Sequence, residues 1–262
     1  MGKDQTVLFH STIFGPIHSR RLGVSLGINL MPDDGKVCSF DCLYCEAGFN
    51  SQGKGSTGLP LRDQVRVQLE GKLRAMHANG DPLDVITFSG NGEPTLHPDF
   101  PHVIEDTLAL RDKFYPNAKV SVLTNSTMIF KPEVAEALKK ADNNILKLDS
   151  AIEETMRLID RPNSKDFTVE KVIDALCQFE GSGIIQTMIL RGTHEGNKID
   201  NTTDEEIQAL IAAYKRIRPR EIMIYSLDRS TPEDNLIKVE KEELTLIGRR
   251  IESATAIPVQ VN

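Results

Sequence analysis

The sequence predicts one α/β domain whose sheet is mostly parallel. Short apolar segments alternate with longer segments of helical periodicity from about residue 22 to the end of the 262-residue chain. This alternation is typical of βαβ units, whose strands run parallel. The length suits one large or two small domains. No linker or internal repeat interrupts the pattern, so we expect a single domain over residues 1–262, with residues 1–20 as an N-terminal extension.

Local signals mark the individual elements. The loose alternation of apolar and small residues in LGVSLGINL indicates the first strand, and the later strands are short apolar runs. Pro132 suits the first turn of a helix, and Thr202 or Thr203 suits the N-cap of another. We therefore expect strands at 22–30, 83–88, 119–123, 145–148, 184–190, 221–225 and 257–261, and helices at 61–78, 100–114, 131–140, 168–180, 204–217 and 241–254.

The composition is that of an ordinary globular protein, with 39% hydrophobic and 26% charged residues. A net charge of -7 argues against a surface that binds nucleic acid everywhere, although a local basic patch is compatible with it. The N-terminal MGKDQTVLFH lacks the regions of a signal peptide, and no apolar run is long enough to span a membrane. A cluster of reduced thiols belongs in a reducing compartment, so we expect a cytoplasmic protein without a membrane partner.

Three cysteines, Cys38, Cys42 and Cys45, stand at C-x3-C-x2-C spacing in the segment CSFDCLYC. An odd number of thiols leaves one unpaired in any disulfide framework. Three thiolates on one short loop suit a [4Fe–4S] cluster and leave its fourth iron open to an outside ligand. A structural zinc site normally needs four ligands, and the chain has no second C-x2-C pair. The fourth cysteine, Cys177, lies in an apolar helical pattern, which indicates a small buried hydrophobe.

The spacing C-x3-C-x2-C with Tyr44 directly before the third cysteine resembles the signature of the radical S-adenosylmethionine (SAM) superfamily. The flanking segments HSRRLGVSLGINLMP and FSGNGEPTLHPDF are similar to the branch that contains the tRNA wyosine-base synthases. Six βα units are too few for a closed eight-stranded barrel, and the resemblance implies a partial (β/α)6 TIM-like barrel. It also implies two cofactors, a [4Fe–4S] cluster and SAM, and an external one-electron donor of the flavodoxin or ferredoxin type.

The resemblance assigns SAM to the carboxyl ends of the strands, where parallel α/β barrels bind their ligands. The segment SGNGEPT is similar to the family's Gly-Gly-Glu motif, which binds the amino group of SAM, with Asn91 in place of the first glycine. Gly92 leaves the backbone open to a close ligand. Glu93 can accept a charge-assisted hydrogen bond from an ammonium group.

Later strand ends add further candidates. Lys147 and Asp149 alternate with leucines, so their side chains share one face of a strand, which points into the barrel lumen. A structural salt bridge between them is the alternative. Apart from the resemblance, the short polar residues after the third strand could equally well form a turn. Through the resemblance, the residues expected to bind SAM besides the glycine-rich motif are Tyr44, Thr124, Asn125, Asp149, Ser150 and Gln186.

Other polar residues are candidates for contact with the substrate. His194 and Glu195 follow the fifth strand and could bind substrate or move a proton, whereas a merely solvated histidine is the alternative. A polar cluster at 18–21 precedes the first strand and either pairs with surface acids or holds an anionic group. The candidate catalytic residues are Lys147, His194, Glu195 and Arg229, and the segment 160–162, Asp-Arg-Pro, is interpreted as structural or surface.

The resemblance implies an enzyme that cleaves SAM reductively to methionine and a 5′-deoxyadenosyl radical, which abstracts hydrogen from a substrate carbon. We expect a nucleoside, a tRNA base or a small metabolite as substrate. The wyosine synthases carry further cysteines for a second cluster, but only Cys177 remains here, which argues against their reaction. Three alternatives stay open: a non-catalytic iron–sulfur electron carrier or sensor, a glycyl-radical-enzyme activase, and a structural zinc module.

Overall fold

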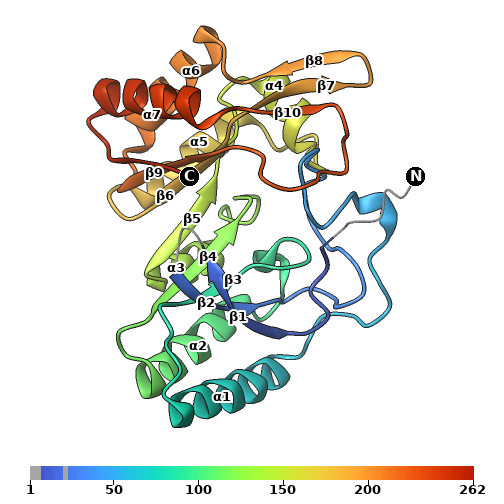
Figure 1. Cartoon of the computed structure of the whole chain (residues 1–262), viewed down its shortest axis with the longest axis vertical. Coiled ribbons are helices and arrows are strands. Elements are labelled where there is room, and N and C mark those ends of the chain that lie inside the picture. The colour runs from blue at the N-terminus through green and yellow to red at the C-terminus, as the bar shows by residue number, and fades with distance from the viewer. Residues whose placement is uncertain (1–6, 20–22) are drawn as a thin grey trace.

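The computed structural model describes residues 7–19 and 23–262. Its largest element is an eight-stranded sheet with the order β1-β2-β3-β4-β5-β6-β9-β11 (Figure 1). β1 runs antiparallel to β2, and the other neighbouring strands of this sheet are parallel. The strands are β1 (Ile13–Ser19), β2 (Gly23–Ile28), β3 (Val85–Phe88), β4 (Lys119–Thr124), β5 (Asn143–Lys147), β6 (Ile184–Met188), β9 (Glu221–Tyr225) and β11 (Val259–Val261). The mostly parallel, partial barrel expected from the sequence is confirmed.

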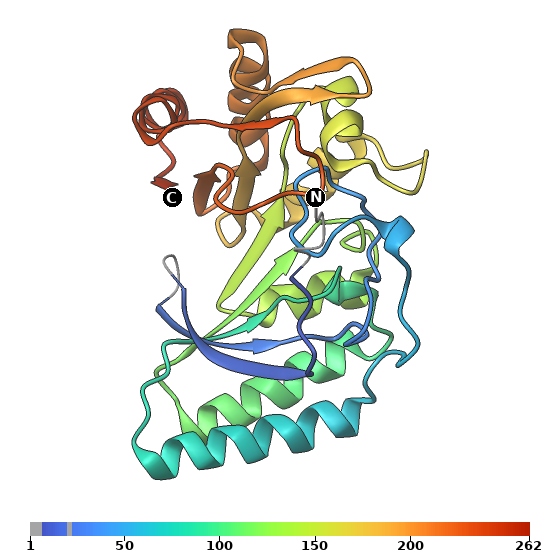
Figure 2. The ribbon, with the colours of Figure 1, turned by 45° about the vertical axis from the view of Figure 1, so that its right-hand side comes forward.

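Helices connect the parallel strands and cover the outer face of the sheet. Figures 1 and 2 show α1 and α2 side by side outside the half of the sheet formed by the early strands, with α6 and α7 beyond β6 and β9. The Thr203 side chain accepts a hydrogen bond from Glu206 N–H and caps α6, as the sequence predicts. The helices are α1 (Arg62–Asn79), α2 (Phe100–Phe114), α3 (Pro132–Lys140), α4 (Glu153–Asp160), α5 (Val169–Leu176), α6 (Asp204–Ile217) and α7 (Lys241–Thr255), with short 3-10 turns at Asn50–Gln52, Pro94–Leu96 and Cys177–Phe179.

Two parts of the sheet structure differ from the expectation. Residues 13–19, expected within an N-terminal extension, instead form the edge strand β1. The run at 184–190 does not remain one strand, because the chain turns into a second, antiparallel sheet with the order β10-β7-β8. Its strands are β7 (Leu190–His194), β8 (Asn197–Asp200) and β10 (Leu236–Lys238). Of the polar cluster predicted at 18–21, His18 lies exposed in β1, and Arg20 and Arg21 lie outside the described residues.

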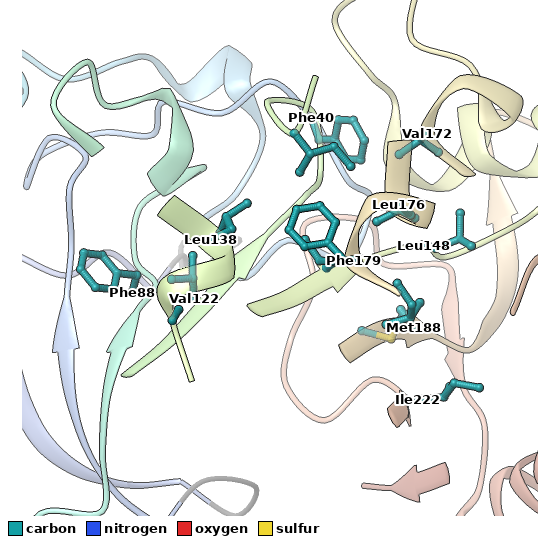
Figure 3. Packing of buried hydrophobic residues seen from close by; sticks show 14 of the residues in the cluster. Phe40, Phe88, Val122, Leu138, Leu148, Val172, Leu176, Phe179, Met188 and Ile222 are labelled. Atoms are coloured by element: carbon teal, nitrogen blue, oxygen red, sulfur yellow. The ribbon is translucent and has the colours of Figure 1, made fainter. Parts of the chain in front are cut away.

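The core lies between the sheet and the helices. Apolar side chains alternate along the strands, so those of one face pack against the helices. Figure 3 shows part of this core, with Phe88 and Val122 from neighbouring strands and Leu138, Leu176 and Phe179 from the elements that cover the sheet. On the opposite, inner face, a small separate apolar cluster forms from Ile145, Ile184 and Met223, with Leu123 packed against it. Polar side chains can therefore occupy the inner face beyond this cluster, nearer the carboxyl ends of the strands.

Cys177 is only partly buried, which corrects the expectation of a fully buried side chain. It lies where α5 ends, and its thiol donates hydrogen bonds to Ile173 O at 3.2 Å and Arg216 O at 3.6 Å. Within the described ranges, none of the helices combines the length and the apolar character needed to cross a bilayer.

Candidate cofactor site at the strand ends

The loop that carries the cysteines, residues 38–45, is aligned by the backbone of the segment after β3. Val37 and Gly92 form a parallel bridge. Val37 N–H donates to Asn91 O at 3.0 Å, and Glu93 N–H donates to Val37 O at 3.0 Å. The glycine-rich segment and the cysteine loop are therefore one hydrogen-bonded unit, which places the predicted SAM motif directly beside the predicted metal ligands.

The other side of the cysteine loop is held by the last turn of α4 and the chain that follows it. Leu43 N–H donates to Ile159 O at 3.0 Å, and Asn163 N–H donates to Ser39 O at 2.9 Å. Asn163 Nδ2 also donates to Cys38 O at 3.1 Å. Hydrogen bonds to the backbone on both flanks therefore hold the loop in position.

Gly92 has no space for a side chain. Its φ of +137° is a conformation that residues with a Cβ rarely adopt, and a Cβ built there lies 1.8 Å from Val37 O. The close approach of the two backbones thus requires glycine at this position.

We expect Gly92→Ala to lower the free energy of unfolding by about 1–3 kcal/mol or more, because the substitution adds backbone strain and a contact with Val37 O. Urea denaturation of the two proteins measures this change. Gly71→Ala is the matched control, since Gly71 lies inside α1 with no atom within 4 Å of a built Cβ, and alanine should stabilise that helix by up to about 1 kcal/mol. Equal stabilities for the two variants would contradict the proposed backbone contact.

The three thiols have different surroundings. Cys42 is 6% exposed, and Cys38 and Cys45 are partly exposed. Lys147 Nζ lies 3.6 Å from Cys42 Sγ, and Asn125 Nδ2 lies 3.6 Å from Cys38 Sγ. Burial raises the pKa of Cys38 to about 12 and raises the pKa of the Cys42 thiol well above its usual range. Both thiols are therefore protonated at neutral pH, and a bound metal has to displace the protons.

These surroundings fit an iron–sulfur cluster. Among residues 7–19 and 23–262, no three His, Cys, Asp or Glu side chains converge closely enough to share one metal ion. A cluster makes no such demand, because each cysteine binds a different iron atom. Hydrogen bonds to the sulfurs tune such clusters, and Asn125 and Lys147 present donors to Cys38 and Cys42.

Cysteine alkylation provides a check on this geometry. In the cluster-free protein at neutral pH, we expect iodoacetamide to modify Cys42 at least about tenfold more slowly than Cys177, because Cys42 is buried and its thiol has a raised pKa. Mass spectrometry of peptides at successive times gives the two rates. Faster modification of Cys42 than of Cys177 would show that the loop is more open than described.

Glu93 joins the ends of β3 and β4. The side chain is 2% exposed. Its Oε1 accepts from Thr95 N–H at 3.0 Å and from Thr124 Oγ1 at 2.7 Å, and Oε2 accepts from Asn125 N–H at 2.6 Å. Burial raises the pKa of Glu93, although the hydrogen bonds from Asn125 and Thr95 oppose this rise. Since a carboxylate has about four lone-pair sites and Oε2 has one partner among the described residues, Oε2 can still accept from an ammonium group.

Lys147 is the centre of a buried charged network. Its Nζ lies 3.2 Å from Asp149 Oδ2 and 3.6 Å from Asp160 Oδ1, so the structural salt bridge to Asp149 is present. Nζ also donates to the hydroxyl of Tyr44, which in turn donates to Asp149. Burial alone would lower the pKa of Lys147, but Asp149, Cys42 and Asp160 raise it well above its usual range. This raised pKa favours the ammonium form of Lys147.

Asp160 belongs to the site, which the sequence interpretation missed. The residue ends α4 and is 2% exposed. Its Oδ1 accepts from Cys42 Sγ at 3.5 Å. Burial raises the pKa of Asp160, and Asp149 contributes in the same direction. The signal in the sequence was the segment Asp-Arg-Pro. The helix that ends at Asp160 is short and was not predicted, so the sequence did not place Asp160 beside the cysteines.

Two residues expected at the SAM site are occupied elsewhere. Asn91 Nδ2 donates to Phe9 O at 2.9 Å and to Pro32 O at 2.8 Å, and Asn91 Oδ1 accepts from Phe9 N–H at 2.8 Å. Ser150 Oγ donates to Glu206 Oε2 of α6 at 2.7 Å. Both side chains are fully buried by these structural bonds, and their contact with SAM stays a prediction.

Gln186 has the opposite character. It lies on β6 directly opposite Lys147 of β5 in the register of the sheet. The side chain is 8% exposed, yet its amide forms no hydrogen bond with another residue in the described part of the chain. An unbonded amide beside Lys147 is suited to bind a polar ligand, and contact of Gln186 with SAM stays a prediction.

The candidate catalytic residues outside the lumen separate into two groups. Glu195 occupies the exposed turn between β7 and β8 with a φ of +49°, and its contact with a substrate stays a prediction. His194 Nδ1 lies 2.6 Å from Glu233 Oε2. Arg229 Nη1 donates to Glu46 Oε2 at 2.5 Å, and Glu46 directly follows the third cysteine. His194 and Arg229 are therefore each paired with a carboxylate, His194 with Glu233 and Arg229 with Glu46.

An open, mostly parallel barrel that carries three cysteines on a loop at the strand ends defines a class of proteins that use an iron–sulfur cluster with SAM. The family model described as the radical SAM superfamily matches residues 34–192. The chain belongs to the radical SAM superfamily, whose members are generally enzymes that use SAM and an iron–sulfur cluster with an external electron donor.

Two similar proteins differ in how much of their own length aligns with this chain. A UPF0026 protein of Methanocaldococcus jannaschii is 31% identical and aligns with 88% of this chain and 68% of its own length. A protein of Brachyspira hyodysenteriae named GTPase Obg is 29% identical over 99% of this chain, but the chain spans only 36% of that protein. Residues 48–54 have the G-x4-G-K spacing of a nucleotide-binding P-loop. Gly55 follows instead of Ser or Thr, and the segment does not open a helix, so it is not a P-loop.

Solved structures share the fold at low sequence identity. A radical SAM methyltransferase from Sphaerobacter thermophilus has a TM-score of 0.63 at 14% identity, covering 91% of this chain and 65% of that one. TYW1 with a lysine–pyruvate adduct bound has a TM-score of 0.56 at 14% identity, covering 87% of this chain and 73% of that one. At this level of identity the likeness concerns the fold.

Proposed function

We propose that this protein is a radical SAM enzyme in which Cys38, Cys42 and Cys45 hold a [4Fe–4S] cluster and the ends of β3 to β6 hold SAM. The observation that supports it is the continuous contact from the strand ends to the thiols. Asn125 links Glu93 to Cys38, and Lys147 links the inner face of the sheet to Cys42. An electron carrier needs the cysteine loop alone, whereas this arrangement connects that loop to a polar cradle.

A cluster held by Cys38, Cys42 and Cys45 would supply the electron for reductive cleavage of SAM to methionine and a 5′-deoxyadenosyl radical, which would take a hydrogen atom from the substrate. The chain's residues bind and orient these groups. Glu93 Oε2 accepts from the SAM ammonium group, and the backbone around Gly92 allows the approach. The ammonium form of Lys147 attracts the SAM carboxylate or an anionic part of the substrate.

The substrate of this proposal is a nucleoside, a tRNA base or a small metabolite. The lumen combines the apolar cluster at Ile145 and Met223 with the unbonded Gln186 amide and the Lys147 ammonium. Such a mixture of apolar walls and a few polar groups suits a small, partly polar ligand.

Metal analysis tests the cluster part of the proposal. After anaerobic reconstitution with iron and sulfide, we expect about four iron atoms and four sulfides per chain, and a large loss of both in Cys42→Ala. Cys177→Ala is the matched control and should keep the full content, because Cys177 lies outside the loop. Purified protein that holds about one zinc per chain and no sulfide would instead support the structural zinc module.

A further inference from the structure

The N-terminal segment 7–10 contacts the chain on both sides of the cysteine loop. Val7 N–H donates to Glu46 O at 2.8 Å, and Glu46 directly follows the third cysteine. His10 Nδ1 lies 2.9 Å from Asp33 O, in the chain that leads to the first cysteine. We call residues 7–10 the N-terminal clasp, because this one segment joins the two flanks of the loop.

Asn91 joins the middle of the N-terminal clasp to the glycine-rich segment. Its Oδ1 accepts from Phe9 N–H at 2.8 Å, and its Nδ2 donates to Phe9 O at 2.9 Å. Nδ2 also donates to Pro32 O at 2.8 Å, so both of its hydrogens are used. The backbone N–H of Asn91 donates to Asn29 Oδ1 at 3.1 Å. One fully buried residue thus links the clasp, the end of β2 and the chain that leads to the cysteines.

An asparagine at this position makes contacts that the glycine of the similar family motif cannot make. Glycine has no side chain, so it would leave Phe9 N–H without this partner. Asn91 also directly precedes Gly92, and its own carbonyl accepts from Val37 N–H at 3.0 Å. A displacement of Asn91 would therefore move Gly92 and Glu93 relative to the cysteine loop.

The N-terminal clasp is anchored on the edge of the sheet. The Phe9 ring stacks on the ring of Phe14 in β1, with 3.8 Å between centroids. Phe14 lies against Gly27 of β2, where a built Cβ would be 2.1 Å from the ring. Asn29 N–H donates to Thr12 O at 2.8 Å, which fixes the chain just after the clasp. The clasp is therefore held by two strands of the scaffold and not by the site alone.

We propose that Asn91 is a positioning residue, which acts through the N-terminal clasp to hold the glycine-rich segment and both flanks of the cysteine loop in one arrangement. SAM then meets Glu93 and the cluster at a fixed separation. This proposal rests on the proposed function, since it requires SAM at Glu93. The effect is on affinity, because a cradle that is already ordered does not lose conformational entropy when the ligand binds.

Equilibrium binding of SAM to cluster-loaded variants tests this proposal. For Asn91→Ala we expect a dissociation constant about tenfold higher, with unchanged iron and sulfide content. Phe9→Ala should weaken binding in the same direction, although Phe9 belongs to neither motif, because the variant loses the stacking on Phe14. A direct contact of Asn91 with SAM would instead leave the affinity of Phe9→Ala unchanged.

Asn144→Ala is the matched control for the loss of a buried amide. Asn144 is 2% exposed, and its Nδ2 donates to Leu138 O of α3 at 3.3 Å. It lies near the amino end of β5, away from the strand ends that carry the candidate site. This variant should bind SAM as the unmodified protein does.

Two further readouts separate positioning from a merely structural role. In Phe9→Ala/Asn91→Ala, the loss of SAM affinity should be clearly smaller than the product of the two single losses, because both changes act through one segment. Hydrogen exchange at residues 7–10 of the cluster-free protein should be faster in Asn91→Ala but not in Asn144→Ala. Exchange needs neither cluster nor SAM, so absence of SAM binding in the unmodified protein would be a failure of the proposed function and not of the clasp.

Four results would overturn the positioning role. They are unchanged exchange of residues 7–10 in Asn91→Ala, unchanged SAM affinity in Asn91→Ala or in Phe9→Ala, an equal loss of affinity in Asn144→Ala, and single losses that multiply in the double variant.

Discussion

Glu93→Gln should weaken SAM binding about 10- to 100-fold while the cluster content stays unchanged. The neutral amide removes the charge that attracts the SAM ammonium group, and a hydrogen bond to a charged group contributes about 1.5–3 kcal/mol. The expected loss is measured by equilibrium binding of SAM to the cluster-loaded variant. Glu206→Gln is the matched control, because Glu206 is also a buried glutamate with a pKa raised by burial, but it bonds to Ser150 behind the site.

The pH dependence gives this prediction a second readout. In the proposed function SAM binding requires the Glu93 carboxylate, and burial raises the pKa of this residue. As the pH falls, the carboxylate is therefore protonated at a higher pH than an ordinary glutamate, and SAM binding should weaken there. Glu93→Gln lacks this titration and should show a flat profile in the same range. A variant that binds SAM as tightly as the unmodified protein would remove Glu93 from the site.

Lys147→Met should lower the free energy of unfolding by about 3–5 kcal/mol near neutral pH. The substitution leaves the buried Asp149 carboxylate and the neighbouring Asp160 carboxyl group without their cation, and breaking a buried ion pair from one side has this magnitude. Urea denaturation measures the change. Lys119→Met is the matched control, since the Lys119 side chain is 62% exposed in its ion pair with Asp142 and should contribute less than about 1 kcal/mol.

The sign of the pH effect follows from the pKa of Asp160, which is raised by burial. The folded state then holds a proton that the unfolded state has lost, so stability falls as the pH rises from the ordinary aspartate pKa to the raised one. The charge of Lys147 opposes the rise of the Asp160 pKa. Removal of Lys147 therefore raises this pKa further and widens the pH range over which stability falls. The destabilisation by Lys147→Met should thus be larger at about pH 8 than at about pH 5. A constant difference between the two pH values would contradict the buried network.

The sequence was sufficient for the regular part of the fold. Apolar runs such as 221–225 and the helix at 204–217 with its Thr203 cap appear where predicted, because local periodicity and capping chemistry determine them. The hairpin of β7 and β8 was not predicted, since the apolar run simply continues through Leu190 and the separation at that point depends on tertiary contacts. Edge strand β1 was missed for the same reason, because its pairing with β2 is not visible in its own composition.

The sequence predicted those site residues whose types a motif fixes. It did not predict contacts that depend on the direction in which a side chain points in the folded protein. The cysteines, Gly92 and Glu93 come together as expected. Asn91 matches a motif position, yet its side chain holds the N-terminal segment at Phe9, a contact between residues far apart in the sequence. Asp160 was missed because the signal of its short helix is weak.

The most direct test of the central claim is the formation of 5′-deoxyadenosine from SAM by the anaerobically reconstituted protein with dithionite, detected by mass spectrometry. We predict product with the unmodified protein and none with Cys42→Ala, which cannot hold the cluster. A chain that contains an intact cluster but neither binds SAM nor forms 5′-deoxyadenosine would contradict the enzymatic function and leave an iron–sulfur electron carrier.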